Sequence, residues 1–161
     1  MLNKTIFRNL IIDTLQLADS MLKEWKFDIK LYSPEVVELL MGTCAVESEM
    51  GLWKRQIGGG PARGVFQIEP KTELSLWNDM LAYRLELKMV IHDICGIIAP
   101  NLYALENNLT YQILMARFRY LWVKGAIPRD LDKMAEYWLK GYNAGGKGTV
   151  EKFLKKYQQY C

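Results

Sequence analysis

The sequence predicts a mainly α-helical protein. Apolar residues recur at three- and four-residue steps along most of the 161 residues, which is the spacing of one helix face. Glycine and proline separate these periodic segments, and no segment shows the sustained alternation typical of a half-buried strand. A chain of this length usually forms one domain. We therefore expect a single domain over residues 1–161, with residues 1–32 as an N-terminal helix packed on it.

Composition excludes several classes of protein. Half of the residues are hydrophobic and 24% are charged, which is close to the average for a globular protein. No stretch approaches the roughly 20 consecutive apolar residues of a membrane span, so we expect no membrane insertion. The net charge of +3, from 21 basic and 18 acidic residues, is too small to indicate a nucleic-acid-binding module.

The cysteines and the single histidine do not form a metal-binding or disulfide pattern. Cys44, Cys95 and Cys161 are far apart in the sequence, and His92 lies alone in an apolar run. We expect Cys44 and Cys95 to be core thiols and Cys161 to be an exposed terminal residue. No metal and no organic cofactor is predicted.

Two helices are predicted in the first third of the chain. The first spans about six turns, and its apolar stripe consists of Phe7, Leu10, Ile11, Thr14, Leu17, Ala18, Met21, Leu22 and Trp25. Ser33 followed by Pro34 is typical of an N-cap and a first helical residue, so a second helix begins there. Gly51 is a natural end for this second helix.

The composition of residues 52–69 predicts a loop with at most a small hairpin, because the segment contains four glycines and a proline and shows no sustained hydrophobic periodicity. The helical pattern resumes at Pro70 and ends before Pro100. The apolar face of this region is made by Met89, Val90, Ile94, Ile97 and Ile98.

Three further helices are predicted in the last third. The first covers residues 110–124, before Gly125 and Pro128. Asp130 caps the next helix, which runs through Trp138 to Tyr142. Thr149 caps a last short helix that carries Val150, Phe153, Leu154 and Tyr157.

Glu47 is the strongest candidate for a catalytic group. It lies near the end of the second helix among mostly apolar neighbours, and removal of a carboxyl from water raises its pKa. A carboxyl with a raised pKa can act as a general acid near neutral pH. The structural alternative is an ordinary surface glutamate at a helix end.

Two other segments carry groups that suit a sugar ligand. Phe66 and Gln67 lie in the stretch GVFQIEP of residues 64–70, and Tyr142 and Asn143 lie where a helix ends before a glycine pair. Aromatic faces stack on sugar rings, and amides bind hydroxyl and N-acetyl groups. The structural alternative for Tyr142 and Asn143 is a core contact and a helix cap.

Taken in order, these segments resemble the soluble lytic transglycosylase family of the lysozyme-like superfamily. The resemblance is carried by Glu47-Ser48 at a helix end, by residues 64–70, and by the Tyr-Asn-Ala-Gly sequence of residues 142–145. Residues 116–121 are similar to the family's helix between the second and third motifs.

The resemblance implies a compact lysozyme-like domain with a cleft for the glycan strands of peptidoglycan. Glu47 is then the acid that protonates the oxygen of the β-1,4 bond between N-acetylmuramic acid and N-acetylglucosamine. The same group next accepts the proton of the muramoyl 6-hydroxyl, which closes a 1,6-anhydro ring without water. The residues that this resemblance assigns to the substrate are Ser48, Phe66, Gln67, Glu69, Tyr142 and Asn143. Trp53, in the loop beside Glu47, is a further candidate for stacking on a sugar.

The chain departs from the family pattern at several positions. Glu69 replaces an apolar residue of the second motif, and Arg117 stands where the middle helix commonly has glycine. Residues 71–108 are more numerous than the family pattern leads us to expect, which predicts an added helix or a reshaped cleft wall.

Two alternative functions remain open at this point. A hydrolytic muramidase would need a second carboxylate about 5 Å from the acid for retention, or about 6.5–9.5 Å for inversion. Glu49, Glu69 and Glu73 are the candidates for that group. The other alternative is a non-enzymatic component of a virion or a secretion apparatus, which uses the same fold to bind glycan or a protein partner.

No secretory leader is predicted, because Arg8 and Asp13 interrupt the apolar part of the N-terminal segment. We therefore expect an enzyme that acts on the bacterial cell wall and reaches the periplasm by another route. A bacteriophage endolysin released through holin pores, or a virion-associated enzyme, fits this expectation. A monomer is expected.

Overall fold

Helices make up most of the computed structural model, which describes residues 1–161, and no β-strand is present. The prediction of a mainly α-helical protein is therefore confirmed. The elements in chain order are α1 (Lys4–Glu24), α2 (Pro34–Ser48), α3 (Pro70–Ser75), the π-helical segment η1 (Leu76–Leu81), α4 (Leu85–Cys95), α5 (Leu102–Asn107), α6 (Leu109–Leu121), α7 (Leu131–Gly141) and α8 (Val150–Tyr160).

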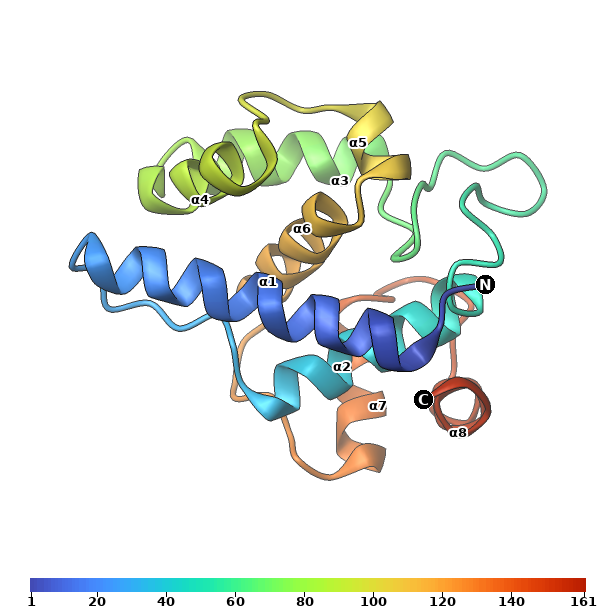
Figure 1. Ribbon diagram of the computed structural model, residues 1–161. Coiled ribbons are helices and arrows are strands. Elements are labelled where there is room, and N and C mark those ends of the chain that lie inside the picture. Colours follow the sequence, from blue (N-terminus) through green and yellow to red (C-terminus); the bar gives the residue numbers. More distant parts are fainter.

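Helix α6 is the centre of the arrangement. Residues 111–118 are all buried, so this helix is covered on every side. Figure 1 shows α3, α4 and α5 gathered on one side of α6, and α2, α7 and α8 on the other. Helix α1 lies across both groups and packs on α2, α4 and α6. The buried side chains form one continuous hydrophobic core of 40 residues, from Phe7 in α1 to Phe153 in α8.

The predicted helix caps are confirmed. The Ser33 hydroxyl accepts a hydrogen bond from the Val36 amide at 3.3 Å, and Pro34 is the first residue of α2. The Asp130 and Thr149 side chains accept hydrogen bonds from amides in the first turns of α7 and α8, at 3.0 and 3.1 Å. Each cap supplies an acceptor for an amide that has no partner inside its helix.

The predicted apolar face before Pro100 is partly wrong. Helix α4 ends at Cys95, because Gly96 adopts a left-handed conformation with φ 69°. Ile98 therefore lies beyond the helix and is 71% exposed, and Met89 is also exposed. Residues 70–107 nevertheless contain α3, η1, α4 and α5. The expectation that one of these helices is added relative to the family stays a prediction.

Two of the cysteine expectations also need correction. Cys44 is fully buried as predicted, whereas Cys95 is only partly buried. Cys161 is not an exposed terminal residue, because it packs against the edge of the core. All three thiols are free.

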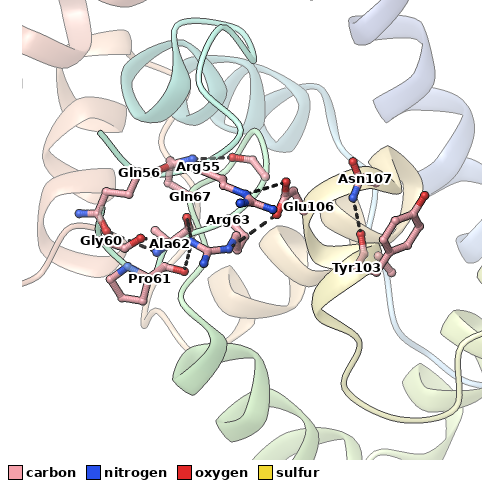
Figure 2. A network of polar contacts seen from close by, with 12 residues as sticks. Arg55, Gln56, Gly60, Pro61, Ala62, Arg63, Gln67, Tyr103, Glu106 and Asn107 are labelled. Carbon is pink, nitrogen blue, oxygen red and sulfur yellow. Dashed lines mark hydrogen bonds and ion pairs between the residues drawn. The ribbon is translucent and has the colours of Figure 1, made fainter. Parts of the chain in front are cut away.

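The loop between α2 and α3 has no regular strand. Isolated bridges pair Arg55 with Arg63, and Arg63 with Ile68. Figure 2 shows that Arg55 and Arg63 both point toward Glu106 of α5. The Arg55 Nε atom donates to the two Glu106 carboxylate oxygens at 3.0 and 3.1 Å, and the Arg63 Nε atom lies 3.7 Å from Glu106 Oε2. These ion pairs attach the loop to α5.

No helix combines the length and the apolar character needed to cross a lipid bilayer.

Close packing of α8 on α2 depends on Gly42. A Cβ atom at this position would lie 2.3 Å from Cζ of Phe153, which is too close for any real contact. We expect Gly42→Ala to lower the free energy of unfolding in urea by about 1–3 kcal/mol, because α8 must shift to accept the methyl group.

The double variant Gly42→Ala/Phe153→Leu is the control, because leucine has no atom at the Cζ position. We expect it to lose less stability than the sum of the two single variants. A Gly42→Ala protein as stable as the wild type would contradict the proposed packing of α8 on α2.

Candidate active site

Glu47 lies in the last turn of α2 and is half-buried. The Trp138 indole nitrogen donates a hydrogen bond to Glu47 Oε1 at 3.2 Å. This bond joins α2 to α7, across 91 residues of sequence. The surface-glutamate alternative therefore does not describe this side chain.

The surroundings of the carboxyl change its acidity. Burial raises the pKa of Glu47 above its usual value of 4.5, and this is the largest effect on it. Hydrogen bonding by the Trp138 indole and the Asn143 amide lowers the pKa and offsets part of that rise. The positive charges of Arg119 and Lys152 act in the same direction. The net result is a carboxyl that holds its proton to a higher pH than an exposed glutamate does.

Trp138 is held firmly against its neighbours. Its ring lies 5.4 Å from the ring of Phe153 in α8, measured between centroids. On another side it meets the backbone of Gly148, where a Cβ atom would lie only 2.4 Å from the indole. The Gly148 amide donates to Asn143 Oδ1 at 3.0 Å, which closes the turn of residues 143–148 and holds Gly148 against the indole.

Tyr142 connects the end of α7 to the loop that contains the second motif. Its side chain is buried, and its hydroxyl donates to the carbonyl oxygen of Phe66 at 2.8 Å. The Arg119 guanidinium lies over the Tyr142 ring, 3.7 Å from its centroid, and donates to the Tyr142 carbonyl oxygen. On α6, Tyr120 stacks on Tyr142 at 5.0 Å and shares a 2.6 Å hydroxyl–hydroxyl bond with Thr43 of α2.

Ser48 organises the turn that follows Glu47. Its buried hydroxyl donates to the Val65 carbonyl oxygen at 2.6 Å and accepts from the Gly51 amide at 2.9 Å. Glu49, Met50 and Gly51 all have positive φ, at 52°, 57° and 77°, so the chain turns sharply here. Ser48 thus fixes both the end of α2 and the approach of the loop to it.

The GVFQIEP segment is placed beside this turn. Helix α6 also binds the backbone of this segment, because the Gln112 side chain accepts a hydrogen bond from the Val65 amide at 2.7 Å. Gln67 has a left-handed backbone with φ 48°, and its amide nitrogen donates to the carbonyl oxygens of Gly64 at 2.8 Å and Trp53 at 3.2 Å. Trp53 itself is 42% exposed.

The seven predicted site residues, Glu47 among them, play different parts in this structure. Asn143 lies close enough to Glu47 to lower the pKa of its carboxyl. Ser48, Phe66 and Tyr142 are buried and bring the three motifs together through hydrogen bonds, so they position other groups. Gln67 is half-buried and bonded within its loop, while Glu69 lies at the start of α3 and pairs with Lys71 at 2.9 Å. Substrate contact by these residues stays a prediction.

Sequence reasoning missed the roles of Trp138 and Arg119. The sequence pattern indicates only a core position for Trp138, and it includes Arg119 only as part of a similar helix. One signal for Trp138 is present, since it precedes Tyr142 by four residues and so shares its face of the helix. Contact between Trp138 and Glu47 depends on how α7 packs against α2, which no local pattern encodes.

Two of the three alternative carboxylates are engaged elsewhere. Glu49 accepts from Lys156 Nζ at 2.7 Å and from the Tyr160 hydroxyl at 2.8 Å, both in α8. Glu73 is buried and accepts from the Tyr111 hydroxyl at 2.5 Å and from the Asn101 amide at 2.8 Å. Both carboxylates serve as acceptors inside the fold.

No three histidine, cysteine, aspartate or glutamate side chains come together as a metal site would require. Comparison of the chain with protein-family models, with curated proteins and with solved structures finds no match. The case for a function therefore depends on the residues and on their geometry.

The raised pKa of Glu47 predicts a distinctive dependence of stability on pH. The folded state binds the Glu47 proton more tightly than the unfolded state, so ionisation costs stability as pH rises above 4.5. In a Glu47→Gln variant the new amide does not ionise in this pH range, and its oxygen can still accept a hydrogen bond from Trp138. We expect this variant to be more stable than the wild type at pH 7, with a difference that shrinks toward pH 4.

Glu49→Gln is the matched control, because the Lys156 and Tyr160 hydrogen bonds lower the pKa of Glu49. We expect the opposite result: this variant is less stable than the wild type at pH 7, and the difference shrinks as the pH falls through the folded-state pKa. Urea unfolding at several pH values measures both. A Glu47→Gln protein that is less stable than the wild type at pH 7 would show that Glu47 is not a desolvated acid.

Proposed function

We propose that the protein is a peptidoglycan-cleaving glycosidase, with Glu47 as its catalytic acid and base. The observation that carries this proposal is the half-buried Glu47 carboxyl with a raised pKa, held by the Trp138 indole. A protonated carboxyl near neutral pH is what cleavage of a glycosidic bond requires of the enzyme. The resemblance to the soluble lytic transglycosylase family supports the same chemistry.

The hydrogen bond from Trp138 distinguishes the two carboxyl oxygens of Glu47. Trp138 donates to Oε1, so Oε1 acts as an acceptor and Oε2 is the better placed atom for a transferable hydrogen. We propose that Oε2 donates this hydrogen to the glycosidic oxygen as the bond to the muramoyl residue breaks. The resulting carboxylate is stabilised by the Trp138 and Asn143 groups, which lower its pKa, and by the charge of Arg119.

Glu47 is the one candidate carboxylate that is not paired elsewhere in the fold, which favours the transglycosylase over the hydrolase. In the transglycosylase, the Glu47 carboxylate accepts the proton of the 6-hydroxyl while that oxygen attacks the anomeric carbon and forms a 1,6-anhydro ring. A hydrolase generally uses a second carboxylate to activate water or to form an intermediate. Glu49 and Glu73 are occupied by hydrogen bonds within the fold, and Glu69 pairs with Lys71. Hydrolysis remains the alternative, and the chemical form of the product ends distinguishes the two reactions.

The exposed groups near the second motif suit a glycan. Trp53 has a partly exposed indole that offers a flat apolar face for a sugar ring, and its carbonyl oxygen is held by Gln67. Gln67 supplies its side-chain oxygen for hydroxyl and N-acetyl substituents, because its amide nitrogen is already bonded within the loop. Asn143 supplies its amide nitrogen, because its oxygen already accepts from Gly148. A lysozyme-like domain with a glycan cleft lined by these side chains is part of the proposal, as is delivery to the wall by holin pores or by a virion.

The direct test is activity on purified peptidoglycan by zymography, with mass spectrometry of the soluble products. We expect Glu47→Gln to lose about 100- to 10,000-fold in rate, which is the usual contribution of a general acid or base. We expect the wild type to release muropeptides with 1,6-anhydro ends. Products with reducing ends would select the hydrolase instead.

Glu49→Gln is again the matched control, since it removes a carboxyl two residues away without touching Trp138. We expect it to keep most of the activity. Equal activity of Glu47→Gln and the wild type would remove Glu47 from the mechanism. Glycan binding without turnover by the wild type would favour the non-enzymatic alternative.

A further inference from the structure

A cavity of about 530 Å³ lies at the opposite end of α2 from Glu47. It is formed by the start of α2, the end of α6, the segment 123–129 and α7. Val36, at the cavity, and Glu47 are eleven residues apart in one helix, which corresponds to about 16 Å along its axis. None of the predicted site residues lines this cavity. Its volume is typical of a small-molecule site, which usually spans about 300–1,000 Å³.

Arg117 of α6 lines the cavity and is the unusual group in it. The residue is only 7% exposed, yet its hydrogen bonds go to neutral acceptors. The Nε atom donates to the Leu31 carbonyl oxygen at 2.7 Å, and Nη2 donates to the Lys30 carbonyl oxygen at 3.4 Å. The guanidinium forms no ion pair, and its Nη1 atom donates to no protein group.

The carboxylates in this region bond to groups other than Arg117. Asp19 of α1 accepts from the Leu31 amide at 2.6 Å and from the Tyr32 amide at 3.1 Å. Glu35 lines the cavity, and its Oε1 atom pairs with the Arg129 Nε atom at 2.8 Å. Arg117 therefore forms no ion pair, and the negative charge of Asp19 favours the guanidinium only from beyond ion-pair distance.

A buried charge without a counter-ion is costly for a fold. Burial lowers the pKa of Arg117, which reports that cost, although a guanidinium stays protonated in proteins. A ligand that brings a negative charge to Arg117 would remove the cost. The free edge of the guanidinium, with Nη1, is the part available to such a ligand.

The walls of the cavity define the rest of the ligand. Most lining residues are apolar or aromatic, including Val36, Leu121, Ile127 and Tyr137. An inorganic anion would leave these walls without a partner, whereas an anion attached to an apolar body would cover them. One carboxylate also matches the single guanidinium that lacks an ion pair, through charge-assisted hydrogen bonds.

We propose that this cavity binds an organic carboxylate with an apolar body, and specifically the C-terminal end of a short peptide. The carboxylate lies against Arg117, and the last apolar side chain lies against the α2 and α7 walls. Exposed Lys30, which also lines the cavity, adds a second positive charge to the site. The inference does not depend on the proposed glycosidase function. Such a terminus has two sources, a peptide of the cell wall or the end of another protein.

The probes are N-acetyl-Ala-Ala with a free carboxylate and the same peptide with a C-terminal carboxamide, titrated into the full chain by calorimetry. Both are prepared from L-alanine and from D-alanine, because D-alanine is found in wall peptides and L-alanine in proteins. We expect the acid to bind at least about tenfold more tightly than the amide, which corresponds to about 1.4 kcal/mol. Preference for the D or L acid then identifies the source.

Two variants localise the binding. Arg117→Gln removes the charge, and Ala126→Trp fills the cavity from an exposed position while it leaves Arg117 in place. We expect both to lose binding of the acid, and Ala126→Trp to keep the thermal stability of the wild type. Lys155→Gln is the control, because it removes an exposed positive charge in α8, outside the cavity, and should bind as the wild type does.

Three results would each overturn the proposal. The first is failure of the D and L acids to bind better than their amides. The second is wild-type binding of the acid by Ala126→Trp, which decides the question even if Arg117→Gln does not fold. The third is binding of inorganic phosphate to the wild type with no binding of either acid.

Discussion

The hydrogen bond between the Trp138 indole and the Glu47 carboxyl is the interaction on which the candidate site depends. It joins a half-buried acid at the end of one helix to a large side chain of another, and it favours the ionised form of that acid. Two opposing effects act on that acid. Burial disfavours its charge, while the indole, the Asn143 amide and the charge of Arg119 favour it. A group balanced in this way can both release and accept a proton, which is what one carboxylate must do in the proposed transglycosylase.

The rest of the fold holds the Trp138 and Glu47 side chains in these positions. Gly42 lets α8 approach α2 closely enough for Phe153 to support the Trp138 ring. Ser48 holds the turn after Glu47 against the loop, and Tyr142 holds the end of α7 against the same loop. Each contact joins segments that are remote in the sequence. The site is therefore a product of the tertiary packing.

Local chemistry explains why some features were predictable from the sequence. Caps such as Ser33 act within a few residues, and Gly51 takes part in the turn that ends α2 through its own backbone freedom. Glu47 could be singled out because its sequence neighbours are apolar. Its partner Trp138 could not, because periodicity reports which face of a helix is buried and not which residue lies opposite. The packing of Cys161 escaped prediction for the same reason, as did the exposure of Ile98 beyond the end of α4.

The most direct test of this account is the pKa of Glu47 itself, measured by titration of its side-chain carboxyl ¹³C resonance in protein labelled at glutamate. Comparison with Glu47→Gln assigns the resonance. We expect a midpoint above the usual 4.5, and a further rise in Trp138→Phe, because that variant loses the hydrogen bond that stabilises the carboxylate. A midpoint at or below 4.5 in the wild type would contradict the claim that the fold withdraws this acid from water.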